Sequence, residues 1–241
     1  MVDLPDLVGH PVYPSTMERL VRSNGGTVLD AARAALERED VERFVVANAR
    51  LLAPLIPSAL RSADAIEGAR RIVGPDEVVP WPADAGWLEV RPKIAAVLRR
   101  PVEDPLRRED VPDLVLGFTL VGDFLIHPGS GDPGVTGEGS PIALGPCVVT
   151  TDEFDPQTAY VTVRVDGQEW AKGNLNGIAR ALLAEVAIAS REGSLSAGET
   201  FSSGPFELTR FDQRLWPGAV VEIQAEVIGV LRTRLGASTA S

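Results

Sequence analysis

Cysteine is almost absent from this chain of 241 residues, which has only Cys147. A single cysteine excludes an internal disulfide framework and any zinc site built from several cysteines. Because Cys147 lies in the apolar run "PIALGPCVVT", we expect it to be a small buried core residue. No apolar run approaches the roughly 18 to 20 residues that span a bilayer, and the N-terminus lacks a basic region followed by an apolar stretch. The sequence therefore predicts a cytoplasmic protein that does not associate with membranes.

Positive charge is also scarce. The chain has 23 lysines and arginines against 34 aspartates and glutamates, a formal net charge of −11. No stretch gathers the cations that binding to a phosphate backbone requires, so nucleic acid is not an expected partner. With 44% hydrophobic residues, the chain is long enough to bury a sizeable core as one large domain, alone or with a small appendage.

The chain divides into a helical start, a β-rich body and a short tail. Residues 1–50 are predicted to form a small N-terminal helical region, because the segment 27–52 has the composition and apolar spacing of amphipathic helices. Residues 51–236 are predicted to form the main domain, and the small polar residues 237–241 a flexible tail. The expected fold class is α+β, mostly β.

Alternating polarity and turn signals place the elements of the main domain. The segment "YVTVRVDGQEW" alternates valines with polar residues and then meets Asp166-Gly167, a dipeptide favoured in type I′ hairpin turns. One helix is predicted over 174–193, with Asn174 or Asn176 as its cap and Gly193 as its end. Strands are expected over 88–98, 114–124, 143–150, 159–165, 220–228 and 230–235.

The segment "WLEVRPKIAAVL" brings two cations into one strand. Arg91 and Lys93 are two residues apart, so they share a face. Facing a pocket, they would offer donors to a carboxylate or enolate oxygen, and the arginine could bind it bidentately. Two other interpretations remain open: a structural ion pair with Asp123, or exposure to water at an edge marked by Pro92.

Several blocks, in this order and spacing, resemble the fumarylacetoacetate hydrolase family. They are "LLAPLIPSALRSADAIEGARR", "WLEVRPKIAAVL", "LGFTLVGDF", "IALGPCVVT", "VTVRVDGQEWAKGN", "SSGP" and "LWPGAVVEIQAEVIGVLRTRL". The likeness covers about residues 51–236. It implies a mixed β-roll around a metal-dependent pocket, a small-molecule substrate and a homodimer.

Most positions that bind the metal in this family carry other residues here. The family's Glu-x-Glu pair falls on Arg91 and Lys93, its metal-binding aspartate on Ser62, and its general-base histidine on Ala69. The second aspartate is kept as Asp123. A divalent ion takes oxygen ligands and needs its charge offset, so two cations in its place would repel it by several kcal/mol. The resemblance with these replacements predicts no metal and no other cofactor, with Mg²⁺ as the alternative if the alignment is shifted.

Other family positions complete the candidate site. The glutamate that precedes the family's histidine corresponds to Glu67, or Asp64 after a small shift. The family's substrate-contacting arginine corresponds to His127, whose imidazole suits proton transfer at neutral pH. A family lysine falls on Thr136. We therefore predict Lys93, Arg91, Asp123 and His127 as catalytic residues, and Glu67, Ser62 and Thr136 as substrate-binding residues.

Three functional hypotheses follow. The first is a metal-independent enzyme that holds the enolate of a small keto/enol or β-dicarbonyl substrate with Arg91 and Lys93, for isomerisation, cyclisation or decarboxylation. The second is an ordinary metal-dependent C–C bond hydrolase or decarboxylase with ligands from Glu89, Asp64, Glu67 and Asp123. The third is a noncatalytic protein that binds a small acid or acts as a scaffold.

Overall fold

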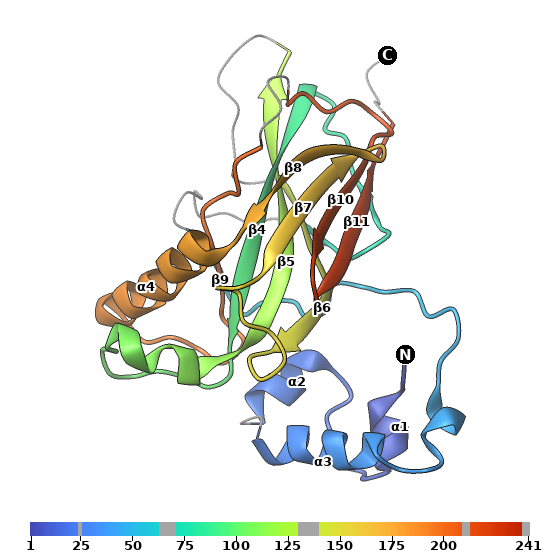
Figure 1. The fold of residues 1–241 in the computed structure, drawn as a ribbon, viewed down its shortest axis with the longest axis vertical. Coiled ribbons are helices and arrows are strands. Elements are labelled where there is room, and N and C mark those ends of the chain that lie inside the picture. The colour runs from blue at the N-terminus through green and yellow to red at the C-terminus, as the bar shows by residue number, and fades with distance from the viewer. Residues whose placement is uncertain (24–25, 63–70, 130–139, 209–212, 238–241) are drawn as a thin grey trace.

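The computed structural model describes residues 1–23, 26–62, 71–129, 140–208 and 213–237 (Figure 1). The helices are α1 (Leu4–Val8), α2 (Met17–Arg22), α3 (Gly26–Leu36) and α4 (Asn176–Glu192), with 3₁₀ turns η1 (Val41–Phe44), η2 (Arg108–Asp110) and η3 (Pro112–Leu114). The strands are β1 (Leu60–Ser62), β2 (Arg71–Val73), β3 (Val78–Val79), β4 (Ala85–Leu98), β5 (Val115–Pro128), β6 (Pro141–Thr150), β7 (Tyr160–Val165), β8 (Gln168–Asn174), β9 (Thr200–Ser202), β10 (Val220–Ala225) and β11 (Gly229–Leu235). Among the described residues no helix is long and apolar enough to span a membrane.

Two sheets build the body of the molecule. One has the strand order β1-β9-β4-β5-β6-β2 and the other β3-β11-β10-β7-β8. Most neighbours are antiparallel, while β1 with β9, β2 with β6 and β3 with β11 are parallel. The predicted α+β, mostly β fold with a small helical N-terminal region is confirmed.

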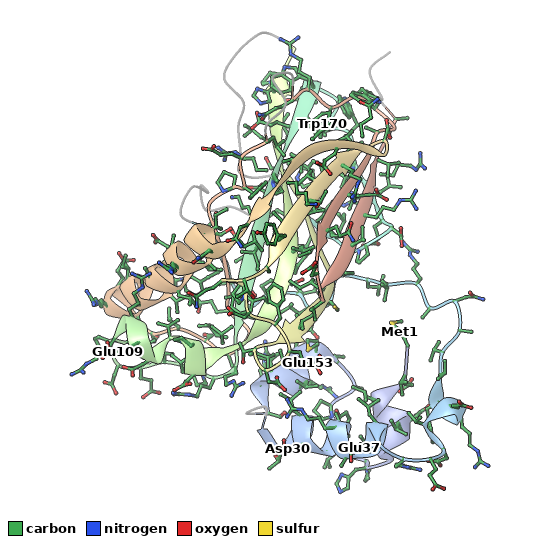
Figure 2. All side chains as sticks on the ribbon, in the orientation of Figure 1. Met1, Asp30, Glu37, Glu109, Glu153 and Trp170 are labelled. Atoms are coloured by element: carbon green, nitrogen blue, oxygen red, sulfur yellow. The ribbon has the colours of Figure 1, made fainter. Side chains whose placement is uncertain are left out.

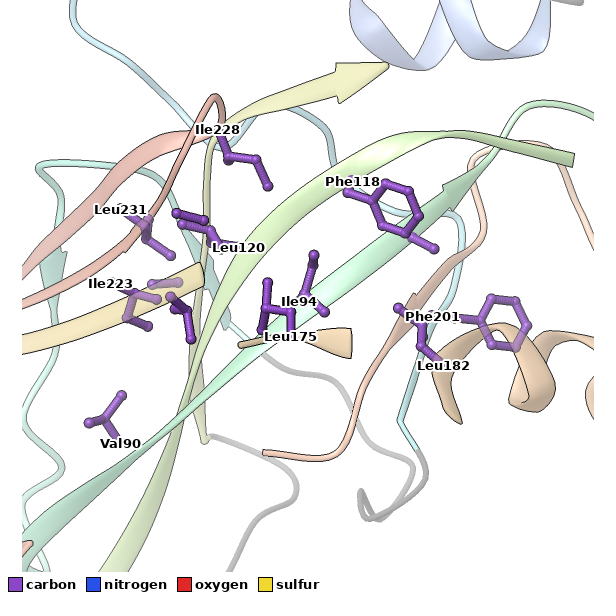
Figure 3. Packing of buried hydrophobic residues seen from close by; sticks show 14 of the residues in the cluster. Val90, Ile94, Phe118, Leu120, Leu175, Leu182, Phe201, Ile223, Ile228 and Leu231 are labelled. Atoms are coloured by element: carbon purple, nitrogen blue, oxygen red, sulfur yellow. The ribbon is translucent and has the colours of Figure 1, made fainter. Parts of the chain in front are cut away.

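The main core lies between the two sheets. Figure 3 shows Val90, Ile94 and Leu120 of the larger sheet facing Ile223 and Leu231 of the smaller one. All five side chains are almost fully buried, with exposures of 2% or less. Burying a side chain of this kind contributes about 1.5–3 kcal/mol, so this layer fixes how the two sheets stack.

Strands β4 and β5 form the long antiparallel pair at the centre of the larger sheet. In β4 the side chains of Leu88, Val90 and Ile94 point into the main core. Glu89, Arg91 and Lys93 therefore point to the opposite face, because side chains alternate along a strand. That opposite face, which we call the outer face, carries the charged residues of the "WLEVRPK" segment.

The N-terminal helices cover one end of the outer face. Val21 of α2 packs in a buried cluster with Leu55, Ala95 and Val97. In Figure 1 helices α1 to α3 lie together beneath the sheets. The region is therefore joined to the body by apolar contact as well as by the chain.

A carboxylate also ties this region to the body. Glu18 of α2 accepts a hydrogen bond of 2.9 Å from the backbone N–H of Ile56. Partial burial acts to raise the pKa of Glu18, but this bond, the Thr16 hydroxyl and the Arg22 guanidinium outweigh it, so the pKa is lowered.

The acidic surplus of the chain lies at its surface. Figure 2 labels Asp30 in helix α3, Glu37 directly after it, Glu109 in η2, and Glu153 after β6. All four side chains are exposed, so they contribute negative charge to the solvent boundary and leave the core apolar.

Three local predictions can be compared with the structure. The hairpin at Asp166-Gly167 is confirmed, with both residues at positive φ (48° and 77°), as a type I′ turn requires. Helix α4 and its end at Gly193 are confirmed, and Asn174 supplies the side chain that accepts the Asn176 N–H at 2.7 Å. Helix formation within 27–52 is also confirmed, since α3 (Gly26–Leu36) lies there and the 3₁₀ turn η1 (Val41–Phe44) follows it.

Arg38 ties the segment that follows α3 to helix α1. Its guanidinium donates to the Leu7 carbonyl at 2.6 Å and binds both carboxylate oxygens of Asp40. Leu7 lies in α1, so these bonds hold the end of α3 near the first helix.

The expectation of a buried Cys147 is wrong, since this residue is exposed. The register of β6 against β5 shifts between the pairs Leu120–Gly145 and Phe118–Val149, which leaves residues 146–148 outside the ladder. A bulge of this kind turns side chains away from the core. Partial enclosure near the Ile228 carbonyl nevertheless raises the pKa of the Cys147 thiol.

Candidate functional site

A row of polar side chains runs along the outer face of β4 and β5. On β4 it consists of Glu89, Arg91 and Lys93, and on β5 of Asp123 and His127, and we call these five residues the polar row. The antiparallel register sets Arg91 directly opposite Asp123. Residues that are paired across a sheet share a face, so the row is a consequence of strand alternation and register.

One end of the polar row is a buried ion pair. The Lys93 Nζ lies 2.9 Å from Asp123 Oδ2, and the two side chains are 1% and 2% exposed. The same ammonium donates to Ser62 Oγ at 3.0 Å. Ser62 ends strand β1, which reaches β4 through β9, so three strands position this contact. Buried charges need partners of this kind, because desolvation of an isolated ion is costly.

The middle of the row is Arg91, which is half-buried. Its position opposite Asp123 and two residues from Lys93 places two cations next to one carboxylate. A guanidinium and an ammonium together can hold a planar anion from two directions, the first with its fork of N–H groups and the second as a point charge.

The other end of the row is an imidazole held on two sides. The Nε2 atom of His127 lies 3.0 Å from Glu89 Oε2. The Trp87 indole is stacked on the imidazole, with centroids 3.4 Å apart and planes within 6°. The Arg214 guanidinium lies 5.5 Å from the centre of the same indole. These contacts restrict the rotation of the His127 ring.

The sequence predicted seven site residues, and five of them lie in the part of the chain that the structure describes. The structure brings most of these five together. Ser62, Lys93 and Asp123 are in contact, Arg91 is beside them, and His127 stands farther along the same face. The ion pair of Lys93 with Asp123 was one of the alternatives left open for these cations. The nominated Glu67 and Thr136, with the alternative Asp64, lie outside the described residues.

Sequence reasoning missed the pairing of Glu89 with His127. Glu89 entered only as a ligand in the metal-dependent hypothesis, and His127 had no partner. The sequence could have shown that Trp87 and Glu89 share a strand face with Arg91. It could not show that they meet His127, because that depends on the register between β4 and β5, and the connection 99–114 between these strands leaves the register undetermined.

The residues of the polar row do not fit a divalent cation. Of the positions that the sequence resemblance assigns to metal ligands, Ser62, Arg91 and Lys93 have no carboxylate, and Asp123 is bonded to the Lys93 ammonium. Across the described ranges there is also no group of three or more His, Cys, Asp or Glu that could hold a metal ion. Hard cations require several oxygen ligands with compensating negative charge.

A separate hollow of about 370 Å³ lies at the surface by helix α4. Its lining comes from α4, η2 and the segment before β7: Arg108, Glu109, Gln157, Arg180 and Leu183. None of the polar-row residues contributes to it.

Comparison with known proteins finds one family that matches this chain. The family described as fumarylacetoacetate (FAA) hydrolase C-terminal matches residues 65–236. A search of curated proteins finds no match.

Solved structures share the fold at low identity. Maleylpyruvate hydrolase from Sphingobium sp. SYK-6 is 20% identical, with a TM-score of 0.75, covering 98% of this chain and 93% of that one. Fumarylacetoacetate hydrolase from Exiguobacterium antarcticum is 20% identical, with a TM-score of 0.73 and coverage of 98% and 91%. The 5-carboxymethyl-2-hydroxymuconate delta-isomerase from Mycobacterium smegmatis is 22% identical, with a TM-score of 0.64 and coverage of 78% and 82%. Similar structures thus include both hydrolases and an isomerase.

Proposed function

Because this chain belongs to the fumarylacetoacetate hydrolase family, we propose that it is an enzyme for a small keto/enol or β-dicarbonyl substrate that works without a divalent metal. The reaction passes through an enolate that Arg91 and Lys93 stabilise. Isomerisation, cyclisation and decarboxylation all use such an intermediate.

The position of the Lys93 ammonium supports this proposal most directly. It lies within hydrogen-bond distance of Ser62 and Asp123, two positions that correspond to metal ligands in the family. A fixed ammonium there provides positive charge where relatives use an ion. Preorganised charge aimed at a developing oxyanion is among the largest contributions to catalysis.

Three further residues of the polar row have a role in this proposal. Arg91 binds the carboxylate or enolate oxygens of the substrate through its guanidinium. Asp123 keeps the Lys93 ammonium in place. His127 moves the proton between carbon and solvent. Hydrolysis has less support, because Ala69 corresponds to the family's general base and cannot activate water.

Two measurements test the proposal. Thermal melts with and without millimolar Mg²⁺ or Mn²⁺ are expected to coincide, since a ligand that binds the native state alone would raise the melting temperature. A panel of β-keto acids, followed through the enol absorbance, is expected to include a substrate.

The variants Lys93→Ala and Arg91→Ala are expected to lower the rate by about 100–1,000-fold, as the loss of one oxyanion donor typically does. Arg91→Ala removes a half-buried residue and so keeps the test valid if Lys93→Ala folds poorly. Lys172→Ala is the matched control, because Lys172 is the only other lysine and is exposed on β8. A metal-induced shift would favour the metal-dependent hydrolase or decarboxylase instead. A panel in which every compound is bound unchanged would favour the noncatalytic alternative.

We also propose that the protein is a cytoplasmic homodimer. Val227 in the β10–β11 turn is 63% exposed and Val230 at the start of β11 is 40% exposed, and a second copy would cover these apolar groups. Light scattering coupled to size-exclusion chromatography tests this, and a mass of one chain at micromolar concentration would contradict it.

A further inference from the structure

Two neighbouring side chains fix the orientation of the His127 imidazole. Glu89 bonds its Nε2 edge at 3.0 Å, and Trp87 covers one face of the ring. The side chains of His127 and Glu89 are only 16% and 22% exposed. Trp87 and His127 are also directly paired in the β4–β5 register, so the backbone itself sets the stack.

We infer that Glu89 is a positioning residue that fixes the tautomer of His127 and leaves Nδ1 as the atom that transfers the proton. This inference rests on the proposed function. An ionised carboxylate only accepts hydrogen bonds, so Nε2 must carry the hydrogen. The lone pair of the neutral ring is then on Nδ1, and Nδ1 has no hydrogen-bond partner among the described residues.

The spacing along β4 sets a condition on the substrate. Residues on one face of a strand are about 6.8 Å apart, so Glu89 and Lys93 are separated by about 13 Å at the backbone. Arg91 lies between them. The carbon that exchanges its proton with His127 is therefore several bonds away from an oxygen held at Lys93. An extended keto/enol substrate with conjugated double bonds satisfies this condition, because its dienolate carries the negative charge from that carbon to the oxygen, whereas a compact substrate contacts only one end of the polar row.

Nitrogen-15 NMR of the imidazole rings tests the positioning without any substrate. The chain has two histidines, His10 and His127, and His127→Ala assigns the signals. In alkaline solution, where the ring is neutral, His127 is expected to be in the Nε2–H form. In Glu89→Gln the side-chain amide both donates and accepts, so a mixture of tautomers is expected. Glu222→Gln, at a partly exposed ion pair between β10 and β11, is the matched control and should leave the signals unchanged.

Kinetics then test the catalytic use of this geometry. Glu89→Gln is expected to lower kcat by about 10–100-fold with little change in KM, the usual cost of losing a residue that orients a catalytic group. Glu89→Asp is expected to restore part of that loss. Longer keto acids are expected to react faster than short ones.

The possible results distinguish a failure of this inference from a failure of the proposed function. A wild-type ring in the Nδ1–H form, or a tautomer that Glu89→Gln leaves unchanged, would overturn the positioning role whatever the activity. A tautomer that shifts in Glu89→Gln while kcat stays the same would overturn its part in the reaction. Failure of every compound in the panel would instead count against the proposed function.

Discussion

Replacement of Lys93 by methionine tests the energetics of the polar row. The substitution preserves most of the side-chain volume and removes the charge. Asp123, only 2% exposed, then loses the ammonium that lies 2.9 Å from it. Removal of one partner from a buried ion pair typically costs about 3–5 kcal/mol, because the remaining charge stays buried and loses its closest opposite charge. For a chain of this size that corresponds to a fall of about 6–20 °C in the melting temperature.

The assay is thermal and urea unfolding followed by tryptophan fluorescence and circular dichroism. Lys172→Met is the control, since exposed substitutions usually change stability by less than about 0.5 kcal/mol. The double variant Lys93→Met/Asp123→Leu is expected to recover most of the lost stability, because apolar pairs often replace buried ion pairs without loss. A Lys93→Met protein as stable as the control would refute the buried pair. So would a double variant whose loss equals the sum of the two single losses.

Three further predictions concern metal binding, acid stability and packing. Arg91→Glu/Lys93→Glu restores the carboxylates of the family pattern, and Mg²⁺ should then raise its melting temperature although it leaves the wild type unchanged; equal behaviour of the two proteins would contradict this. The lowered pKa of Glu18 contributes stability that is present above its ordinary value of 4.5 and is lost as the pH falls through its folded value. Glu18→Gln should therefore be less stable than wild type at neutral pH and match it in acid, as measured by urea unfolding across pH. A Cβ on Gly117 would come within 2.1 Å of a backbone oxygen of β6, whereas one on Gly177 in helix α4 meets nothing within 4 Å. Gly117→Ala should thus lose about 1–3 kcal/mol in unfolding experiments while Gly177→Ala loses nothing.

Local chemistry predicted the strands well because each signal acts over a few residues. The alternation before Asp166-Gly167 and the turn itself depend only on neighbouring side chains, and the structure has that hairpin. The error at Cys147 occurred where a distant feature decides the outcome. The register of β6 against β5 shifts there, and this turns Cys147 outward. That shift is not visible in a window of sequence.

The candidate site likewise has features that local sequence predicted and features that depend on distant residues. The spacing of Arg91 and Lys93 predicted that both point to one face of a strand, and the register of β4 and β5 agrees. Whether Lys93 would meet Asp123, water or a substrate depended on residues 30 positions away. Because strand register across the connection 99–114 has no local signal, the pairs Lys93–Asp123 and Glu89–His127 required the structure.

The two pairs give the polar row two different ends, and the proposed enolate mechanism uses both. At one end Lys93 is paired with Asp123, and Arg91 lies directly opposite Asp123 on the neighbouring strand. At the other end Glu89 lies 3.0 Å from the Nε2 atom of His127, and the Trp87 indole stacks on the same ring. In the proposed reaction the cations at the first end stabilise the enolate oxygen, and the oriented imidazole at the second end moves the proton.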